Sequence, residues 1–352
     1  MNQHAHSSID VIIVGAGLAG SILAYRLLQH GARVRVIHAP SVMPPASRVA
    51  AGIINPITGQ RFVLQAQADL LLQEAVAFYH HIEHRFKVKV WHPLPMQRAI
   101  QTLKQQQAWK KRQDAPDYQP YWDALKSSDL QLMQKQTGYL DTNILLDTLH
   151  HHFMQLGCLY SEEFYQFPLE MTENETLWNG VRSKKIIFCE GWRAQSNPWF
   201  AYLPFQPAKG EILTLTVDQS LTQKILNDGK WLLPISPNQC KFGASYENNV
   251  WDEVPTAAVQ AQLLDHFATM QPALTGVRVI NHQAGVRAGT ADKQPVLGWH
   301  PHYPSLGIFN GLGSKASMLT PWYSAQWSNY FFNQTPLPAH SDIARFSSRL
   351  VL

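Results

Sequence analysis

The chain has 352 residues, 45% of them hydrophobic and 15% charged, and its formal net charge is +4. This length suffices for two lobes with substantial cores, and the mild basic excess, without a long lysine and arginine run, argues against a nucleic-acid-binding tail. The three cysteines lie far apart without metal-ligand spacing, which argues against a disulfide framework or a zinc site and predicts no bound metal.

The first predicted elements are a strand, a glycine-rich turn and a helix. The apolar run at 11–14 predicts a buried strand, and apolar residues between 22 and 28 recur with helical spacing. A second strand is expected at 33–37, after the helix-ending Gly31. This order is typical of a βαβ unit that binds the pyrophosphate of a dinucleotide.

The turn itself suits a phosphate. Gly15 permits a tight turn, Gly17 allows the backbone to approach a phosphate, and Gly20 lets the helix lie close to the strand. The free N–H groups and the positive dipole end of the helix also favour an anion. The predicted binding segment is Gly15, Ala16, Gly17, Leu18, Ala19 and Gly20.

One position departs from the usual pattern. The second strand of such a unit normally ends in an acidic residue that hydrogen-bonds a ribose, and here that position is His38. A neutral imidazole can still donate or accept one hydrogen bond. We therefore keep His38 as a cofactor-binding candidate, although it cannot decide between NAD and FAD.

The middle of the chain mixes helices with short strands. A loop at 40–45 and a run of small residues at 46–56 precede a predicted helix at 64–85, and another helix is expected from Asp141 or Thr142 onward. His150, His151 and His152 are adjacent and cannot face one ion from a helix, so we interpret them as a polar helix end. A buried strand at 184–189 leads to Gly191, another candidate phosphate neighbour.

The remaining segments predict a mostly antiparallel sheet and then a return to the first lobe. Strands are expected at 210–216, 231–235, 241–245 and 277–284, helices at 256–270 and from Ser314, and glycine-rich turns at 307–313. We expect a cofactor domain at 1–85, 137–200 and 281–352, and a substrate domain at 86–136 and 201–280. No apolar stretch approaches the roughly 20 residues that cross a bilayer, and no secretory signal is recognisable, which predicts a cytoplasmic protein without a membrane partner.

Five motifs in this order resemble the D-amino-acid-oxidase-like family of FAD-dependent amine oxidoreductases. They are Gly15 to Gly20, Ala46 to Gly52, Gly138 to Asp141, Ala284 to Arg287 leading to Asp292 and Pro295, and Gly311 to Ser314. The resemblance implies an α/β fold, α+β overall. It also implies a Rossmann-like FAD-binding domain of the glutathione-reductase-like type, and an interleaved substrate domain on a mixed, mostly antiparallel sheet. The FAD would be non-covalent, because no cysteine lies in a recognised attachment context.

The resemblance assigns cofactor roles. Ser47 and Arg48 would contact phosphate, and Ala51, Gly52 and Ile53 would line the isoalloxazine ring. Small residues let the backbone lie against a flat ring, and a guanidinium bonds phosphate in a bidentate way. The alternative for Arg48 is a solvated side chain on a surface loop.

The last motif would face the flavin edge on which negative charge accumulates during reduction. Its residues are Gly311, Leu312, Gly313, Ser314 and Lys315. A helix N-terminus stabilises such charge, and Lys315 either adds a positive charge or points to solvent.

Arg287 stands where the family places an arginine that binds the substrate carboxylate, although an ion pair with Asp292 or another acid is the alternative. Lys209 is a candidate for assisting oxygen reduction or binding an acidic substrate, and Tyr246 for closing over the substrate. Arg61 is a further anion-binding candidate. For Lys209 and Tyr246, an ordinary core or surface role is equally open.

These assignments imply an FAD-dependent amine or amino-acid oxidase or dehydrogenase. A carboxylate-bearing primary or secondary amine would give a hydride to flavin N5, the imine would be hydrolysed, and O2 or another acceptor would reoxidise the flavin. One alternative is a tRNA-modifying oxidase acting on a carboxymethylaminomethyl-uridine. Another is a nucleotide-binding protein without oxidase activity.

Overall fold

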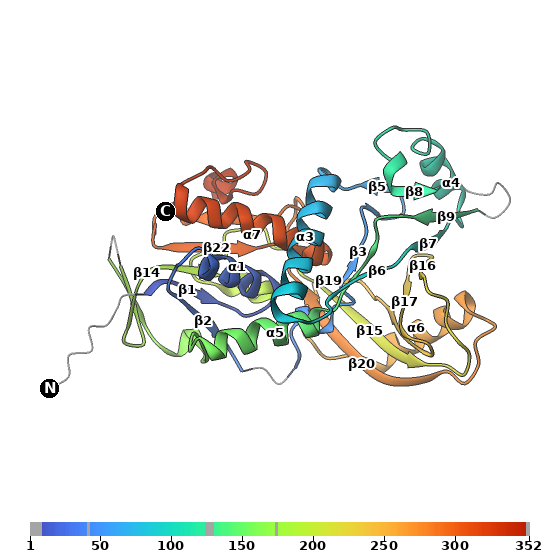
Figure 1. Cartoon of the computed structure of the whole chain (residues 1–352), viewed down its shortest axis with the longest axis horizontal. Coiled ribbons are helices and arrows are strands. Elements are labelled where there is room, and N and C mark those ends of the chain that lie inside the picture. The colour runs from blue at the N-terminus through green and yellow to red at the C-terminus, as the bar shows by residue number, and fades with distance from the viewer. Residues whose placement is uncertain (1–8, 41–42, 124–129, 173–174, 350–352) are drawn as a thin grey trace. The chain divides into compact units, whose positions relative to one another are not determined.

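The computed structural model describes residues 9–40, 43–123, 130–172 and 175–349. They form two compact units, each built from separate stretches of the chain (Figure 1). The first unit comprises Met1–Arg48, Leu145–Ala208 and Arg287–Leu352, and the second comprises Val49–Ile144 and Lys209–Val286. Residues 49–85 and 137–144 therefore pack with the second unit. Compactness does not decide which residues bind a cofactor, so the division by function stays a prediction.

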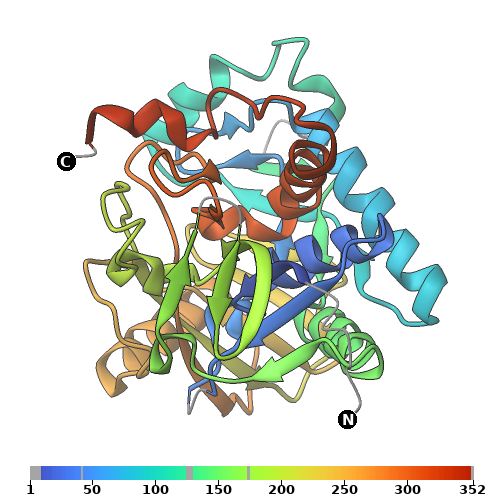
Figure 2. The ribbon, with the colours of Figure 1, turned by 90° about the vertical axis from the view of Figure 1, so that its left-hand side faces the viewer.

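An eight-stranded sheet forms the core of the first unit. Five strands run parallel in the order β11 (Leu159–Ser161), β2 (Val34–His38), β1 (Ile9–Val14), β14 (Val181–Phe188) and β22 (Leu306–Asn310). Antiparallel pairings add β12 (Leu169–Met171), β13 (Thr176–Trp178) and β21 (Val296–Trp299). The blue β1 and the yellow-green β14 run side by side in Figure 2. Their buried apolar runs are typical of parallel strands covered on both faces.

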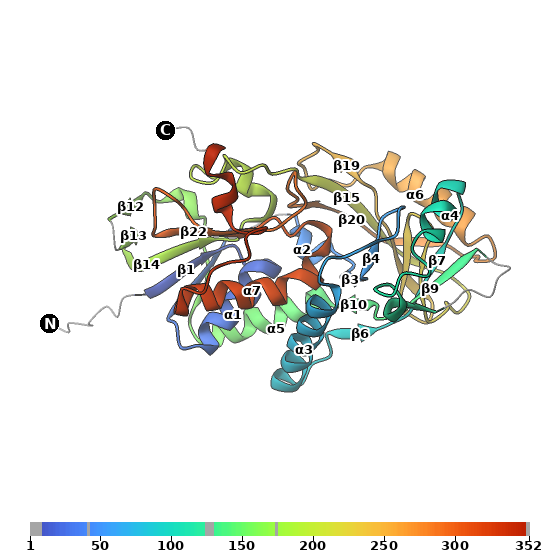
Figure 3. The same ribbon diagram turned by 90° about the horizontal axis from the view of Figure 1, so that it is seen from above.

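Three helices lie side by side in the first unit (Figure 3). They are α1 (Leu18–Gln29), α5 (Thr142–Gln155), which begins in the second unit, and α7 (Ala316–Asn333). Helix α1 lies between the other two, because Ser21 contacts His150 of α5 and Arg26 donates to Ser324 of α7. Arg26 also donates to the carbonyl of Pro321 at 3.1 Å, which fixes α7 beside α1.

The second unit contains a nine-stranded mixed sheet. Its path is β19 (Glu247–Asn248), β15 (Ala208–Thr216), β18 (Gln239–Gly243), β17 (Trp231–Ser236), β16 (Ile225–Asn227), β7 (Met96–Ala99), β9 (Gln131–Gln134) and β8 (Trp122–Asp123), and β20 (Arg278–Arg287) also pairs with β15. Strands β16 and β7 are parallel, whereas β15–β18, β18–β17 and β7–β9 are antiparallel. Helix α6 (Ala257–Met270) packs its apolar face on this sheet through Leu263 and Phe267.

Shorter elements complete the chain. Small sheets join β3 (Ile53–Ile54), β10 (Gly138–Leu140) and β6 (Trp91–Pro93), and also β4 (Ile57–Thr58) and β5 (Val63–Leu64). The other helices are α2 (Ala46–Val49), α3 (Ala68–Phe86) and α4 (Leu103–Lys110), and 3-10 turns span Gln119–Tyr121, Phe164–Gln166, Gly191–Ser196, Gly313–Lys315 and Ile343–Arg349.

Several expected boundaries need correction. The segment predicted as glycine-rich turns at 307–313 begins with the buried strand β22, and the turn proper starts at Gly311. The last helix begins at Ala316 after a 3-10 turn, rather than at Ser314. The histidines at 150–152 lie inside α5, which continues to Gln155, and so are not a helix end.

Within the described ranges, no helix combines the length and apolar character needed to span a membrane.

Candidate functional site

Four predicted cofactor residues lie at one edge of the first unit's sheet. Gly15, His38, Gly191 and Gly311 follow or end β1, β2, β14 and β22, and these strands are parallel. Asn310 Nδ2 donates to the carbonyl of Gly191 at 2.8 Å, which ties two of these strand ends together. The carboxyl edge of a parallel sheet is where such folds bind ligands.

The glycines of the first turn have steric reasons to be glycine. Gly15 has φ +107°, and a Cβ atom there would lie 2.4 Å from the carbonyl oxygen of Cys189. A Cβ on Gly20 would lie 1.8 Å from the carbonyl oxygen of Gly15. The close approach of α1 to β1 that the sequence predicted therefore exists in the structure.

The start of α1 is suited to an anion. Gly17 precedes the helix and has no side chain with which to cap it, and the first turn carries no acidic residue. Ser47 Oγ accepts a hydrogen bond from the N–H of Leu18 at 3.1 Å, so the predicted phosphate-binding serine lies at this helix end. The helix dipole and a helix start without an acidic side chain favour a phosphate here, which fits the pyrophosphate of FAD.

Arg48 lies beside two side chains of α5. Its Nη1 is 2.5 Å from Asp147 Oδ1, and its Nη2 is 3.5 Å from His150 Nδ1. The Arg48 side chain is 24% exposed, so it is not the fully solvated side chain that the alternative proposed. The ring of His38 stacks on that of His150 with 6.2 Å between centroids. Burial, and then the charge of Arg48, lower the pKa of both imidazoles.

A group of three residues next to Gly191 was not identified as part of a site from the sequence. Glu190 accepts hydrogen bonds from Tyr165 Oη at 2.7 Å and from Asn197 Nδ2 at 2.8 Å. Burial raises the pKa of Glu190, although both hydrogen bonds oppose the shift. A carboxyl directly before Gly191 was visible in the sequence, but its partners are distant in the chain.

The last motif forms a tight turn ahead of α7. Gly311 and Gly313 have φ of +77° and +55°, and the N–H of Gly313 donates to the carbonyl of Ala288 at 2.9 Å. Leu312 is buried and Ser314 is exposed. Lys315 is partly buried, and burial together with the charge of Lys293 lowers its pKa.

Arg287 is the last residue of β20. Asp292, the acid considered as its alternative partner, accepts a hydrogen bond from Arg345 Nε at 3.0 Å. Burial opposes ionisation of Asp292, but the hydrogen bonds from Arg345 and from the Gln294 N–H outweigh it and lower its pKa. Asp292 is thus paired with Arg345, and the substrate role of Arg287 stays a prediction.

In the second unit, two of the family-like motifs pair with each other. Leu140 N–H donates to the carbonyl of Gly52 at 2.9 Å, and Tyr139 pairs with Ile53 across β10 and β3. Gly52 has φ +69°, and a Cβ there would lie 1.9 Å from the carbonyl oxygen of Leu140. Ala51 is buried beside this glycine. The strand pairing itself therefore requires glycine at position 52.

Lys241 contacts the same segment and was not identified as a site residue from the sequence. Its Nζ donates to the carbonyl of Ala50 at 3.4 Å. Burial lowers the pKa of Lys241, while the charge of Asp141 acts in the opposite direction. Nothing in the sequence indicated this burial. Lys241 lies between the apolar residues Cys240 and Phe242, and this alternation is also typical of a strand residue that faces solvent.

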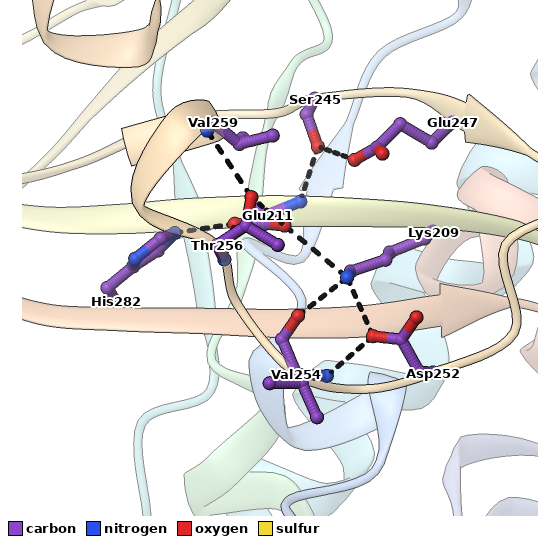
Figure 4. A network of polar contacts seen from close by, with 9 residues as sticks. All are labelled: Lys209, Glu211, Ser245, Glu247, Asp252, Val254, Thr256, Val259 and His282. Atoms are coloured by element: carbon purple, nitrogen blue, oxygen red, sulfur yellow. Dashed lines mark hydrogen bonds and ion pairs between the residues drawn. The ribbon is translucent and has the colours of Figure 1, made fainter. Parts of the chain in front are cut away.

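Lys209 lies inside a buried polar network (Figure 4). Its Nζ is 2.7 Å from Asp252 Oδ1 and 3.5 Å from Glu211 Oε1, and it donates to the Val254 carbonyl at 2.6 Å. Glu211 is fully buried and lies 2.7 Å from His282 Nε2. Burial alone would lower the pKa of Lys209, but Asp252 and Glu211 outweigh it and raise that pKa. These contacts favour a structural role in the core for Lys209, which was the alternative to its predicted role in oxygen reduction or substrate binding.

The two remaining candidates are on the surface. The Tyr246 side chain is 62% exposed, in the segment between β18 and β19. Arg61 is exposed between β4 and β5. Their predicted roles toward a substrate stay predictions.

The fold, together with the carboxyl edge of the parallel sheet, is typical of nucleotide-binding α/β proteins. The first unit carries a parallel βαβ unit with a glycine-rich turn. The family profile described as FAD-dependent oxidoreductase (DAO) matches residues 10–327. The chain therefore belongs to the DAO family of FAD-dependent oxidoreductases, and it is an FAD-dependent oxidoreductase.

Individual relatives agree with this family. Glycine oxidase of Bacillus subtilis (strain 168) is 21% identical, with 92% of this chain and 93% of that protein covered. The bifunctional protein MnmC of tRNA 5-methylaminomethyl-2-thiouridine biosynthesis from Dichelobacter nodosus is 22% identical, with 93% of this chain but 55% of that protein covered. The structure of iminodiacetate oxidase (IdaA) from Chelativorans sp. BNC1 shares the fold, with a TM-score of 0.79, 20% identity, and coverage of 94% and 98%.

Proposed function

We propose that this protein oxidises a primary or secondary amine that carries a carboxylate, and that the imine product is then hydrolysed. The start of α1 at the glycine-rich turn, with Ser47 beside it and no acidic residue in its first turn, carries the proposal, because it supports the anion site that a flavin dinucleotide requires. Bound FAD supplies the hydride acceptor for this oxidation.

In this proposal the first unit holds the nucleotide end of the cofactor. Ser47, Arg48 and the Gly15 to Gly20 turn bind phosphate, and Gly191 lies at the same sheet edge. The 3-10 turn from Gly313 to Lys315 presents a helix start, which stabilises developing negative charge. The glutathione-reductase-like subtype of the domain belongs to this proposal too.

Ala51, Gly52 and Ile53 line the flat ring of the flavin in this proposal, and the small side chains of Ala51 and Gly52 permit that contact. Arg287 binds the substrate carboxylate, because its planar fork matches a carboxylate and fixes the substrate orientation. Lys209 and Lys241 are both candidates for assisting oxygen reduction. Lys241 is the better placed, because it contacts the Ala50 carbonyl whereas the charge of Lys209 is balanced by two acids.

Two relatives support a small carboxylate-bearing amine as substrate. One is named glycine oxidase and the other iminodiacetate oxidase. The test is an anaerobic flavin-reduction screen with glycine, sarcosine, iminodiacetate, proline and D-amino acids. We expect the yellow protein to bleach with at least one of them. A protein that stays colourless in excess FAD would exclude the proposal, and reoxidation in air against dye acceptors distinguishes an oxidase from a dehydrogenase.

A modified uridine in tRNA is the second candidate substrate. The match to MnmC, which spans nearly this whole chain, favours it, and a carboxymethylaminomethyl group is also a carboxylate-bearing secondary amine. This candidate requires tRNA binding whose affinity falls steeply with salt. Absence of binding at low salt would remove it and leave the small-molecule substrate.

A further inference from the structure

We propose that His150 is a positioning residue for the cofactor, because its imidazole connects the glycine-rich turn to Arg48 and holds the guanidinium in the orientation that receives phosphate. This inference rests on the proposed phosphate-binding role of Arg48. All the groups concerned belong to the first unit. They come from the glycine-rich turn, α1, α2 and α5, and α5 lies about 100 residues after α2 in the sequence.

The contacts of Nε2 determine where His150 carries its proton. Nε2 lies 2.9 Å from the carbonyl oxygen of Ala16 and 3.1 Å from Ser21 Oγ. Ser21 Oγ itself donates to the Ala16 carbonyl at 3.0 Å. A lone pair on Nε2 would face a carbonyl oxygen that can only accept, so Nε2 carries the hydrogen and donates to Ala16. The imidazole is therefore anchored to the second residue of the glycine-rich turn.

The other ring nitrogen faces the arginine. In the neutral ring Nδ1 has a lone pair, and it lies 3.5 Å from Arg48 Nη2. The opposite side of the guanidinium contacts Asp147 Oδ1. Asp147 and His150 are three residues apart on α5 and thus lie on the same helix face. Together they hold the guanidinium from two sides, which reduces the entropy that Arg48 loses when a phosphate binds.

The surrounding charges keep the ring neutral. Burial is the largest influence that lowers the pKa of His150, and Arg48 and His38 lower it further. The hydrogen bond to the Ala16 carbonyl and the carboxylate of Asp147 act in the opposite direction. Protonation in acid would place a proton on Nδ1 and bring two cations within 3.5 Å. Arg48 would then have to move, so we expect affinity for FAD to fall as the pH falls.

The experiment measures the FAD dissociation constant of the deflavinated full chain by fluorescence titration at a series of pH values from about 8 down to about 5, because the pKa of His150 lies below that of an ordinary imidazole. The wild type should bind more weakly at the lowest pH than at about pH 8. His150→Leu should bind about tenfold more weakly than wild type at the higher pH, which is the loss expected for one hydrogen bond to a charged group.

Two further variants make the test specific. His150→Gln retains an amide donor for Ala16 but cannot titrate, so it should bind more tightly than His150→Leu and lack the pH-dependent loss. The exposed neighbour His151 is the matched control, and His151→Gln should behave as wild type. His38→Gln should retain the pH-dependent loss, because it leaves the contacts of His150 with Ala16 and Arg48 in place.

Contrary outcomes are distinguishable. If wild type binds FAD equally at all these pH values, or if His38→Gln rather than His150→Gln abolishes the pH dependence, the positioning role is wrong while the proposed function stands. A wild-type chain that binds no FAD at any of these pH values overturns the proposed function and this inference with it. Apoprotein unfolding temperatures of the variants, expected within a few degrees of wild type, exclude misfolding as the cause.

Discussion

Arg287 ends β20, and the acid nearest to it in the sequence motif is paired with Arg345. We expect Arg287→Ala to raise the KM for carboxylate-bearing amines about 100-fold, because a charged hydrogen-bonded pair with the substrate is lost. The visible spectrum of the bound flavin should be unchanged. Steady-state kinetics with the best substrate of the screen provides the measurement.

The control lies on the same strand. Arg278, at the opposite end of β20, is 67% exposed, and Arg278→Ala should leave the KM near the wild-type value. Equal effects of the two substitutions would contradict the substrate role of Arg287.

Individual residues also show where prediction from sequence ends. Gly15 and Gly20 were predictable because their spacing after an apolar strand is a local pattern in the sequence. The steric reason is local only for Gly20, which faces the carbonyl of Gly15, because Gly15 faces the distant carbonyl of Cys189. His150 was not, because its contacts with Ala16 and Arg48 span 134 and 102 residues. Three adjacent histidines gave no indication that only the first contacts the glycine-rich turn.

At the scale of elements, the network around β15 and β20 is a stability feature. Removing the Lys209 ammonium would leave the fully buried Glu211 with one cationic neighbour fewer. We expect Lys209→Met to lower the free energy of unfolding by about 3 to 5 kcal/mol, the usual cost of breaking a buried ion pair from one side. Urea denaturation of the holoprotein measures this change.

The matched control is Lys135→Met, which removes an exposed pairing with Asp123 in the same unit and should cost at most about 1 kcal/mol. A Lys209→Met protein as stable as this control would contradict the structural role. Slower flavin reoxidation in Lys209→Met than in Lys241→Met would instead support the catalytic role first predicted for Lys209.

The junction between α3 and β6 gives a prediction about pH. Glu83 accepts hydrogen bonds from the N–H groups of Val90 and Trp91 at 3.0 and 2.8 Å. Burial opposes its ionisation, but these bonds, His80 and Lys89 together lower its pKa from 4.5 to about 2. Its contribution to stability is therefore fully present above pH 4.5 and is lost as the pH falls toward 2. Glu83→Gln should lose this part of the pH dependence.

Measuring unfolding free energy against pH for both proteins tests the expectation. Glu170→Gln, at an exposed position of β12, should follow the wild-type curve. A Glu83→Gln curve parallel to wild type below pH 4.5 would show that the α3–β6 junction does not depend on the Glu83 charge.

The predicted secondary structure agrees with the observed elements where one local sequence pattern was sufficient, as in β1, α1 and β2. They failed at β22, because a glycine was interpreted as a turn residue. Gly307 is instead a strand residue beside two aromatic rings: a Cβ there would lie 2.7 Å from the Trp299 ring and 3.0 Å from the Trp327 ring. A glycine required by ring packing has the same sequence signature as a glycine required by a turn.

At the scale of the whole molecule, the cofactor should contribute to stability. The predicted FAD residues are drawn from several distant stretches, so bound FAD stabilises the native state and not the unfolded chain. In FAD at 100 times its dissociation constant, we expect a gain of about 2.7 kcal/mol over the deflavinated protein. Thermal unfolding against FAD concentration measures it, and a midpoint that does not rise with FAD would contradict native-state binding.

The interleaving of the two units was predictable only in outline. The alternation of βαβ-like and antiparallel patterns indicated it, but the boundaries at 48, 144, 208 and 286 follow packing between distant segments. We predicted that residues 49–85 belong to the cofactor domain. No local sequence pattern shows that this segment packs with the second unit.

The late position of β22 and the Gly311 turn has a consequence for biosynthesis. Strand β22 pairs with β14 but is separated from it by more than a hundred residues, and the Gly311 turn follows β22. The nascent chain therefore exposes an incomplete sheet edge while the ribosome makes the intervening residues. Contact of FAD with the Gly311 turn, which belongs to the proposed site, cannot form before β22 has been made.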